Sequence, residues 1–185
     1  MLVVATCALL LLSPLIAGRW SAGLLTHRWR LPLLVWVTLA LQTVVIQVEL
    51  PDRLAGPLHV GTYVAALVFL VVNRRTPGVP LVGAGAAANA ITIALNGGVL
   101  PASAAAVEAA GMDRTAAFAN SGVVADPVLP WLGDVFAWPA PLPLANTFSV
   151  GDVLIAVGVG VAAWTGTRRL TRRDRHLELQ DADAS

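Results

Sequence analysis

Residues 130–154, PWLGDVFAWPAPLPLANTFSVGDVL, join a segment rich in proline and tryptophan to the last apolar run of the chain. The stretch carries two aspartates, Asp134 ahead of most of its prolines and Asp152 in the first turn of the apolar run. An ionisable side chain at membrane depth is costly and usually faces a cavity or a partner. The two carboxylates therefore mark a candidate functional site, and the other segments can be placed around it.

The composition predicts an integral membrane protein. Of the 185 residues, 57% are hydrophobic and only 12% are charged, and the mean hydropathy is +0.74. These values lie outside the usual balance of a soluble domain. All basic residues are arginines clustered between apolar runs, so we expect no nucleic-acid partner. Cys7 is the only cysteine, which excludes an intrachain disulfide or a cysteine-based metal site, and we expect no cofactor.

Five apolar runs predict an all-α, polytopic bundle of five transmembrane helices. The predicted spans cover residues 1–18, 31–50, 58–73, 79–96 and 150–166. Ten of the twelve arginines fall on one side of this bundle, which the positive-inside rule assigns to the cytoplasm. The membrane domain is then residues 1–166, in a bacterial plasma membrane, with the N-terminus outside. Residues 167–185 form a cytoplasmic tail whose basic part is expected to contact anionic lipids.

The predicted outer segment, residues 97–149, contains six prolines, so much of it cannot be regular helix. Residues 103–110, SAAAVEAA, predict a short helix that Gly111 ends. The segment is too apolar to be plainly disordered and too long to be an ordinary connection. We expect it to cover the outer mouth of the bundle, with Trp131 and Trp138 at the interface.

Several polar residues could line a pocket near the aspartates. Asn89 and Asn96 belong to a polar stripe at helical spacing, which could hold the bundle together or line a pocket. Glu49 and His59 lie towards the same outer side and could contribute, or could simply contact water at the interface. Nothing near His59 has the spacing of metal ligands, so no metal site is predicted.

The aspartates allow two interpretations. Two close carboxyl groups in a low-dielectric site cannot easily both ionise, so one could keep its proton while the other acts as a base, as in aspartic proteases. Alternatively, Ser149-x-x-Asp152 matches a capping box, and Asp134 after Gly133 matches a turn. Spacing alone favours the structural interpretation.

Two resemblances follow from these motifs. Asn96-Gly97-Gly98-x-x-Pro101, LPWLGD (129–134) and FSVGD (148–152) resemble a family of small bacterial membrane proteins of unknown function. More remotely, GDVF (133–136) and FSVGD resemble the two catalytic aspartate motifs of lipoprotein signal peptidases, and GAAANAI (85–91) resembles their Gly-rich third helix. This resemblance implies a similar bundle, with Asp134 and Asp152 as the dyad and Asn89 in support. The peptidase's aspartate and arginine after that asparagine have no counterpart here.

Three functions remain open. The first is an aspartate-dyad hydrolase, a possible membrane aspartic peptidase, acting on a lipid-anchored or transmembrane protein at the outer face. The second is a non-catalytic module that binds membrane lipids or a partner helix, which predicts an apolar groove beneath Trp131 and Trp138. The third is a small transporter subunit, disfavoured because no charged residue lies in the middle of the predicted helices 58–73 and 79–96.

Overall fold

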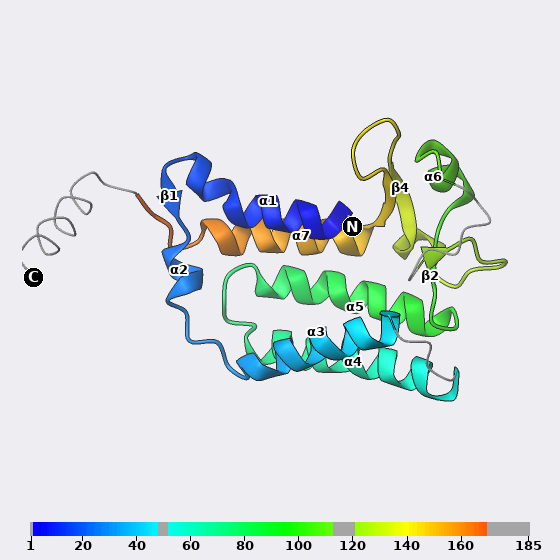
Figure 1. Ribbon diagram of the computed structural model, residues 1–185, viewed down its shortest axis with the longest axis horizontal. Coiled ribbons are helices and arrows are strands. Elements are labelled where there is room, and N and C mark those ends of the chain that lie inside the picture. Colours follow the sequence, from blue (N-terminus) through cyan, green and yellow to red (C-terminus); the bar gives the residue numbers. More distant parts are fainter. Residues whose placement is uncertain (1, 48–51, 113–120, 170–185) are drawn as a thin grey trace, which may run out of the picture.

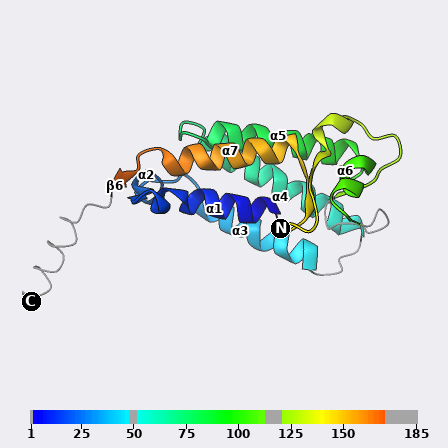
Figure 2. The same cartoon turned by 90° about the horizontal axis from the view of Figure 1, so that it is seen from above.

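Five long helices run side by side along the molecule in the computed structural model, which describes residues 2–47, 52–112 and 121–169 (Figure 1). They are α1 (Leu2–Ile16), α3 (Pro32–Gln47), α4 (Asp52–Val72), α5 (Val79–Leu95) and α7 (Val150–Trp164). The helices pack in the order α1, α7, α5, α4, α3, and the pair α5–α7 has the most extensive contact. Viewed from above, α5 and α7 run together along the length of the molecule (Figure 2).

Short elements close the two ends of the helical bundle (Figure 1). At one end lie β1 (Arg19–Trp20), α2 (Ala22–Leu25) and β6 (Arg168–Arg169). At the other end lie β2 (Leu100–Pro101), α6 (Ala104–Ala109), β3 (Ser121–Gly122), the 3₁₀ turn η1 (Pro130–Leu132), β4 (Asp134–Trp138) and β5 (Asn146–Ser149). The strands form three two-stranded sheets, β1–β6 and β4–β5 antiparallel and β2–β3 parallel.

The predicted fold class is wrong in two respects. The chain is not all-α, because part of the segment predicted to be irregular pairs into sheets. Within the described ranges, no helix combines the length and apolar character needed to cross a membrane, so the prediction of a five-span membrane protein fails as well. Helices α1, α3, α5 and α7 have 15 to 17 residues, or about 23–26 Å at 1.5 Å per residue, against a hydrocarbon core of about 30 Å.

Helix α4 is longer, with 21 residues, but it differs from the prediction at its start. The helix begins at Asp52, six residues before the predicted span of residues 58–73, so that residues 52–57 form its first turns. These turns carry Asp52 and Arg53, which interrupt the apolar run.

The segment after α5 is held in place by specific hydrogen bonds. Gly97 and Gly98 have positive φ angles of 69° and 95°, which end the helix and turn the chain towards β2. The Asn96 side chain then donates to Val128 O at 2.9 Å and accepts from Val128 N at 2.8 Å. Ser103 caps α6 by accepting a hydrogen bond from Ala106 N, and its own N–H donates to Asp134 O at 3.0 Å. The bond from Ser103 places the start of β4 beside the start of α6.

Candidate functional site

The β4–β5 hairpin brings the two aspartates to neighbouring positions. Asp134 is the first residue of β4 and pairs in register with Ser149, the last residue of β5. Ser149 is also the N-cap of α7, three residues before Asp152. A side chain at Gly133 would collide with Pro101 O, so only glycine lets the chain enter β4 at this point. Both carboxylates therefore lie around Ser149, at the junction of hairpin and helix.

Asp152 is held by three hydrogen-bonding contacts. Its Oδ2 accepts from Ser149 N at 3.0 Å, and its N–H donates to Ser149 Oγ at 3.0 Å, which completes a capping box. Its Oδ1 accepts from Asn89 Nδ2 at 3.0 Å, while Ser149 Oγ donates to Asn89 Oδ1 at 2.9 Å. The capping box indicated by the sequence is confirmed, and Asn89 ties it to α5.

Asp134 is more deeply buried, with 5% of its surface exposed. Its Oδ2 accepts from Ser121 Oγ at 2.6 Å and from Thr147 Oγ1 at 3.2 Å, whereas its Oδ1 is buried without a hydrogen-bond partner. Burial raises the pKa of Asp134, and the Asp152 carboxylate raises it further, while the two hydroxyls act in the opposite direction. The neutral form of Asp134 is thus favoured relative to a carboxyl group in water.

The field of Asp152 also reaches two other titratable groups. Burial and, after it, the Asp152 carboxylate raise the pKa of the Tyr63 phenol on α4 and of the Cys7 thiol on α1. Groups on α1 and α4 are therefore within electrostatic range of this carboxylate. Within the described residues, no group of His, Cys, Asp and Glu side chains could hold a metal ion.

An apolar pocket opens directly beside Asp152. It has a volume of about 450 Å³ and lies between α1, α7 and the β4–β5 hairpin. Helix α1 contributes residues such as Leu2 and Leu9, the hairpin contributes Trp138 and Phe148, and Asp152 is the ionisable lining residue. The Trp138 ring is fixed because its Nε1 donates to Pro143 O at 3.0 Å. Both views place the N-terminal end of α1 beside the start of α7 (Figures 1 and 2).

The predicted site residues divide into two groups. Asp134, Asp152 and Asn89 gather around Ser149, as described above. Asn96 lies apart from them and fixes the chain at Val128. Glu49 and the side chain of His59 lie outside the described part of the structure, so their predicted contribution stays a prediction.

Sequence reasoning missed two partners of Asp134, Ser121 and Thr147. Thr147 could have been found, because the alternation of side chains along a strand places it on the same face as Ser149. Ser121 follows a stretch outside the described residues, and its sequence offers no comparable signal.

The chain belongs to a family of unknown function, DUF5317, whose model matches residues 25–164. Neither the curated proteins nor the solved structures contain a match to the chain. The family assignment covers α3 to α7 and includes both aspartates and Asn89, but it gives no activity. Function must therefore be argued from the geometry of the site.

Proposed function

We propose that this protein is a non-catalytic binding module for a lipid-like amphiphile, which it holds in the pocket between α1, α7 and the β4–β5 hairpin. The observation that carries this proposal is the pocket itself, about 450 Å³ in volume, apolar in lining, with Asp152 at its polar edge. Pockets for small ligands commonly have about 300–1,000 Å³ and few polar groups among apolar ones. The predicted groove lay beneath Trp131 and Trp138; Trp138 forms part of the wall of this pocket, and Trp131 is not among its lining residues.

The chemistry of Asp152 defines the head group. Each of its oxygens accepts one hydrogen bond from the protein, and a carboxylate has about four acceptor positions. Among the described residues, no arginine or histidine donates to it. The remaining acceptor positions suit a head group that donates hydrogen bonds, such as an amine, and repel an anionic one. A lipid partner and a location at a bacterial plasma membrane remain parts of this proposal.

Matched amphiphiles test the proposal, because octylamine and octanoate share a similar chain but differ in head group. Octylamine should bind the full-length protein about tenfold more tightly than octanoate, because a charge-assisted hydrogen bond contributes about 1.5 kcal/mol or more. Ala156→Leu, which fills the pocket, should weaken both ligands, and Asp152→Asn should remove most of the preference. Equal affinity for both would reject the head-group assignment, and binding unaffected by Ala156→Leu would reject the pocket.

A second candidate, an aspartate-dyad hydrolase, is favoured by one specific observation. Asp134 is buried, its Oδ1 has no hydrogen-bond partner, and burial together with the Asp152 carboxylate raises its pKa. One carboxyl group could therefore hold a proton while the other acts as a base. The resemblance to bacterial lipoprotein signal peptidases belongs to this candidate. It ranks second because Asp152 is already engaged by Ser149 and Asn89.

Incubation with a tagged prolipoprotein separates the two candidates. The hydrolase requires cleavage by the wild type and its loss in both Asp134→Asn and Asp152→Asn, each checked for folding by circular dichroism. The binding module requires no cleavage by any of the three proteins. Within the described residues, no observation favours a transporter subunit.

A further inference from the structure

One end of the helical bundle collects most of the arginines in the described part of the chain (Figure 1). This end, which we call the arginine-rich end, consists of residues 17–31 between α1 and α3, residues 73–78 between α4 and α5, and residues 165–169 after α7. These three stretches contain no aspartate or glutamate. They carry seven arginines: Arg19, Arg28, Arg30, Arg74, Arg75, Arg168 and Arg169.

Hydrogen bonds hold the three stretches together although their charges repel. The Asn73 side chain accepts from Arg30 N and donates to Arg30 O, both at 3.0 Å, which fixes the first stretch against the second. Strands β1 and β6 join the first stretch to the third, and their register sets Arg19 directly opposite Arg169. Like charges directly opposite one another destabilise a strand pair. The fold therefore concentrates positive charge here without an acidic group in these stretches to offset it.

Large apolar side chains are exposed among these arginines. Leu25, the last residue of α2, and Leu31, directly before α3, have 74% and 52% of their surfaces exposed. Leu31 also has a positive φ of 57°, which is unfavourable for a leucine, and strain of this kind is found most often at functional sites. Basic and apolar side chains that share one surface are typical of proteins that lie on lipid, because the charges attract anionic head groups and the apolar groups insert beneath them.

We propose that the arginine-rich end docks on a membrane surface rich in anionic phospholipids, with its arginines against the phosphates and Leu25 and Leu31 inserted among the acyl chains. Guanidinium groups bind phosphate oxygens through strong, paired hydrogen bonds. A nucleic acid also supplies phosphates, but it has no acyl chains to receive the exposed leucines, so lipid is the partner that fits both features. This docking requires no membrane-spanning helix, and it does not depend on the function proposed for the pocket beside Asp152.

Sedimentation of the full chain with lipid vesicles tests the docking surface. Vesicles of phosphatidylglycerol should bind the protein at least about tenfold more tightly than vesicles of phosphatidylcholine, and added salt should reduce the difference. Arg28 and Arg75 are exposed, and Arg28→Gln and Arg75→Gln should each weaken binding to phosphatidylglycerol about fivefold, because a basic residue near an anionic surface contributes about 1 kcal/mol. Arg53→Gln, in the first turn of α4 at the opposite end of the bundle, is the matched control and should change this affinity less than about twofold.

Leu31→Asn tests whether the leucines insert into lipid. Asparagine adopts a positive φ more readily than leucine, so the variant should be at least as stable as the wild type, while its affinity for phosphatidylglycerol vesicles should fall about fivefold. Ala156→Leu, which fills the pocket beside Asp152, should leave vesicle binding unchanged, so that this proposal and the proposed function can fail separately.

Four results would overturn the inference. They are equal binding to both kinds of vesicle, a loss for Arg53→Gln as large as that for Arg28→Gln, unchanged vesicle binding by Leu31→Asn, and tighter binding to a DNA duplex than to phosphatidylglycerol at the same phosphate concentration. The last result would assign the surface to nucleic acid.

Discussion

The helix pairs α5–α7 and α3–α4 are both built from apolar runs, yet they pack in different ways. In α5–α7 the backbones touch, because a Cβ at Gly85 would collide with Gly151 O and one at Gly158 would lie 2.7 Å from Gly78 O. In α3–α4 larger side chains such as Phe69 hold the helices apart and leave a groove of about 350 Å³. Side-chain size at the contact, more than hydrophobicity, decides how closely two helices approach.

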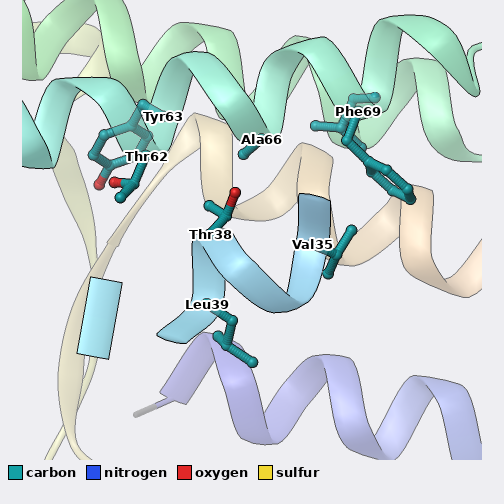
Figure 3. A pocket seen from close by; sticks show the side chains of 8 residues that line it. Val35, Thr38, Leu39, Thr62, Tyr63, Ala66 and Phe69 are labelled. Carbon is teal, nitrogen blue, oxygen red and sulfur yellow. The ribbon is translucent and has the colours of Figure 1, made fainter. Parts of the chain in front are cut away.

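The two pairs also differ in how they treat polar groups. At α5–α7, Asn89 donates to Asp152 and accepts from Ser149, and the Asp152 N–H donates to Ser149 Oγ. Thr92 donates to a carbonyl of its own helix. At α3–α4, Thr38 Oγ1 has no partner. Close packing of two helices brings short polar side chains within hydrogen-bonding distance of one another. A gap between two helices keeps such side chains too far apart to bond. The closely packed helices α5 and α7, the tight pair, are therefore suited to positioning Asp152. The less closely packed helices α3 and α4, the loose pair, leave a buried hydroxyl without a partner (Figure 3).

Gly151→Ala should have the largest effect, because the new methyl group would collide with Asn89 Oδ1 and displace it from Ser149 and Asp152. We expect the free energy of unfolding to fall by about 3 kcal/mol, measured by chemical denaturation. Gly61→Ala is the control, since its Cβ meets nothing within 4 Å inside α4, and it should raise stability by about 0.5 kcal/mol. A loss below about 1 kcal/mol for Gly151→Ala would show that α5 and α7 can move apart freely.

Asn89→Ala should be the next most damaging change. It leaves Ser149 Oγ without its acceptor and Asp152 Oδ1 without its donor, both in the tight pair, and should cost about 2 kcal/mol. Asn96→Ala removes an equally short amide from the same helix, but its bonds to Val128 are exposed, so water can replace them and the loss should stay near about 1 kcal/mol. Equal losses in the two variants would contradict the importance of burial.

The helices were largely predictable from the sequence, and their environment was not. Glycine, proline and arginine interrupt the apolar runs, so five helices could be placed near their observed ranges. Hydropathy predicts that these runs span a membrane, although a helix that stops at Ile16 or Leu95 is short for a bilayer. Composition reports how apolar a run is, but the length of its helix depends on where it is capped.

The candidate site was partly predictable, because a local motif and a long-range contact carry different signals. The capping box at Ser149 and Asp152 spans four residues, so the sequence contains all of it. The pairing of Asp134 with Ser149 depends on the register of two strands across a proline-containing loop, which no residue pattern fixes. Strands as short as β5, with four residues, also give little alternation to detect.

The pH dependence of the unfolding free energy tests whether the Asp134 carboxyl group is buried in solution as it is in the structure. Its raised pKa in the folded protein means that it contributes stability at pH values below the ordinary pKa of aspartate, and that this contribution is lost as the pH rises through the folded-state value. The unfolding free energy of the wild type, relative to Asp134→Asn, should therefore increase on acidification from neutral pH. Parallel curves for the two proteins would mean that Asp134 titrates as it does in water.

Thr38→Val should have the smallest effect, and its sign distinguishes the two helix pairs most directly. Replacing Thr38 removes a buried hydroxyl without a partner and adds a methyl group of similar size, so the free energy of unfolding should rise by about 1 kcal/mol. The same substitution at Thr92, which is fully buried in the tight pair and donates to Ala88 O, removes a satisfied hydrogen bond and should lower it by about 1 kcal/mol. Thermal and chemical denaturation of the two variants should give shifts of opposite sign. Shifts of the same sign would mean that Thr38 Oγ1 forms a hydrogen bond in solution, and that the two helix pairs do not differ in how they treat buried hydroxyls.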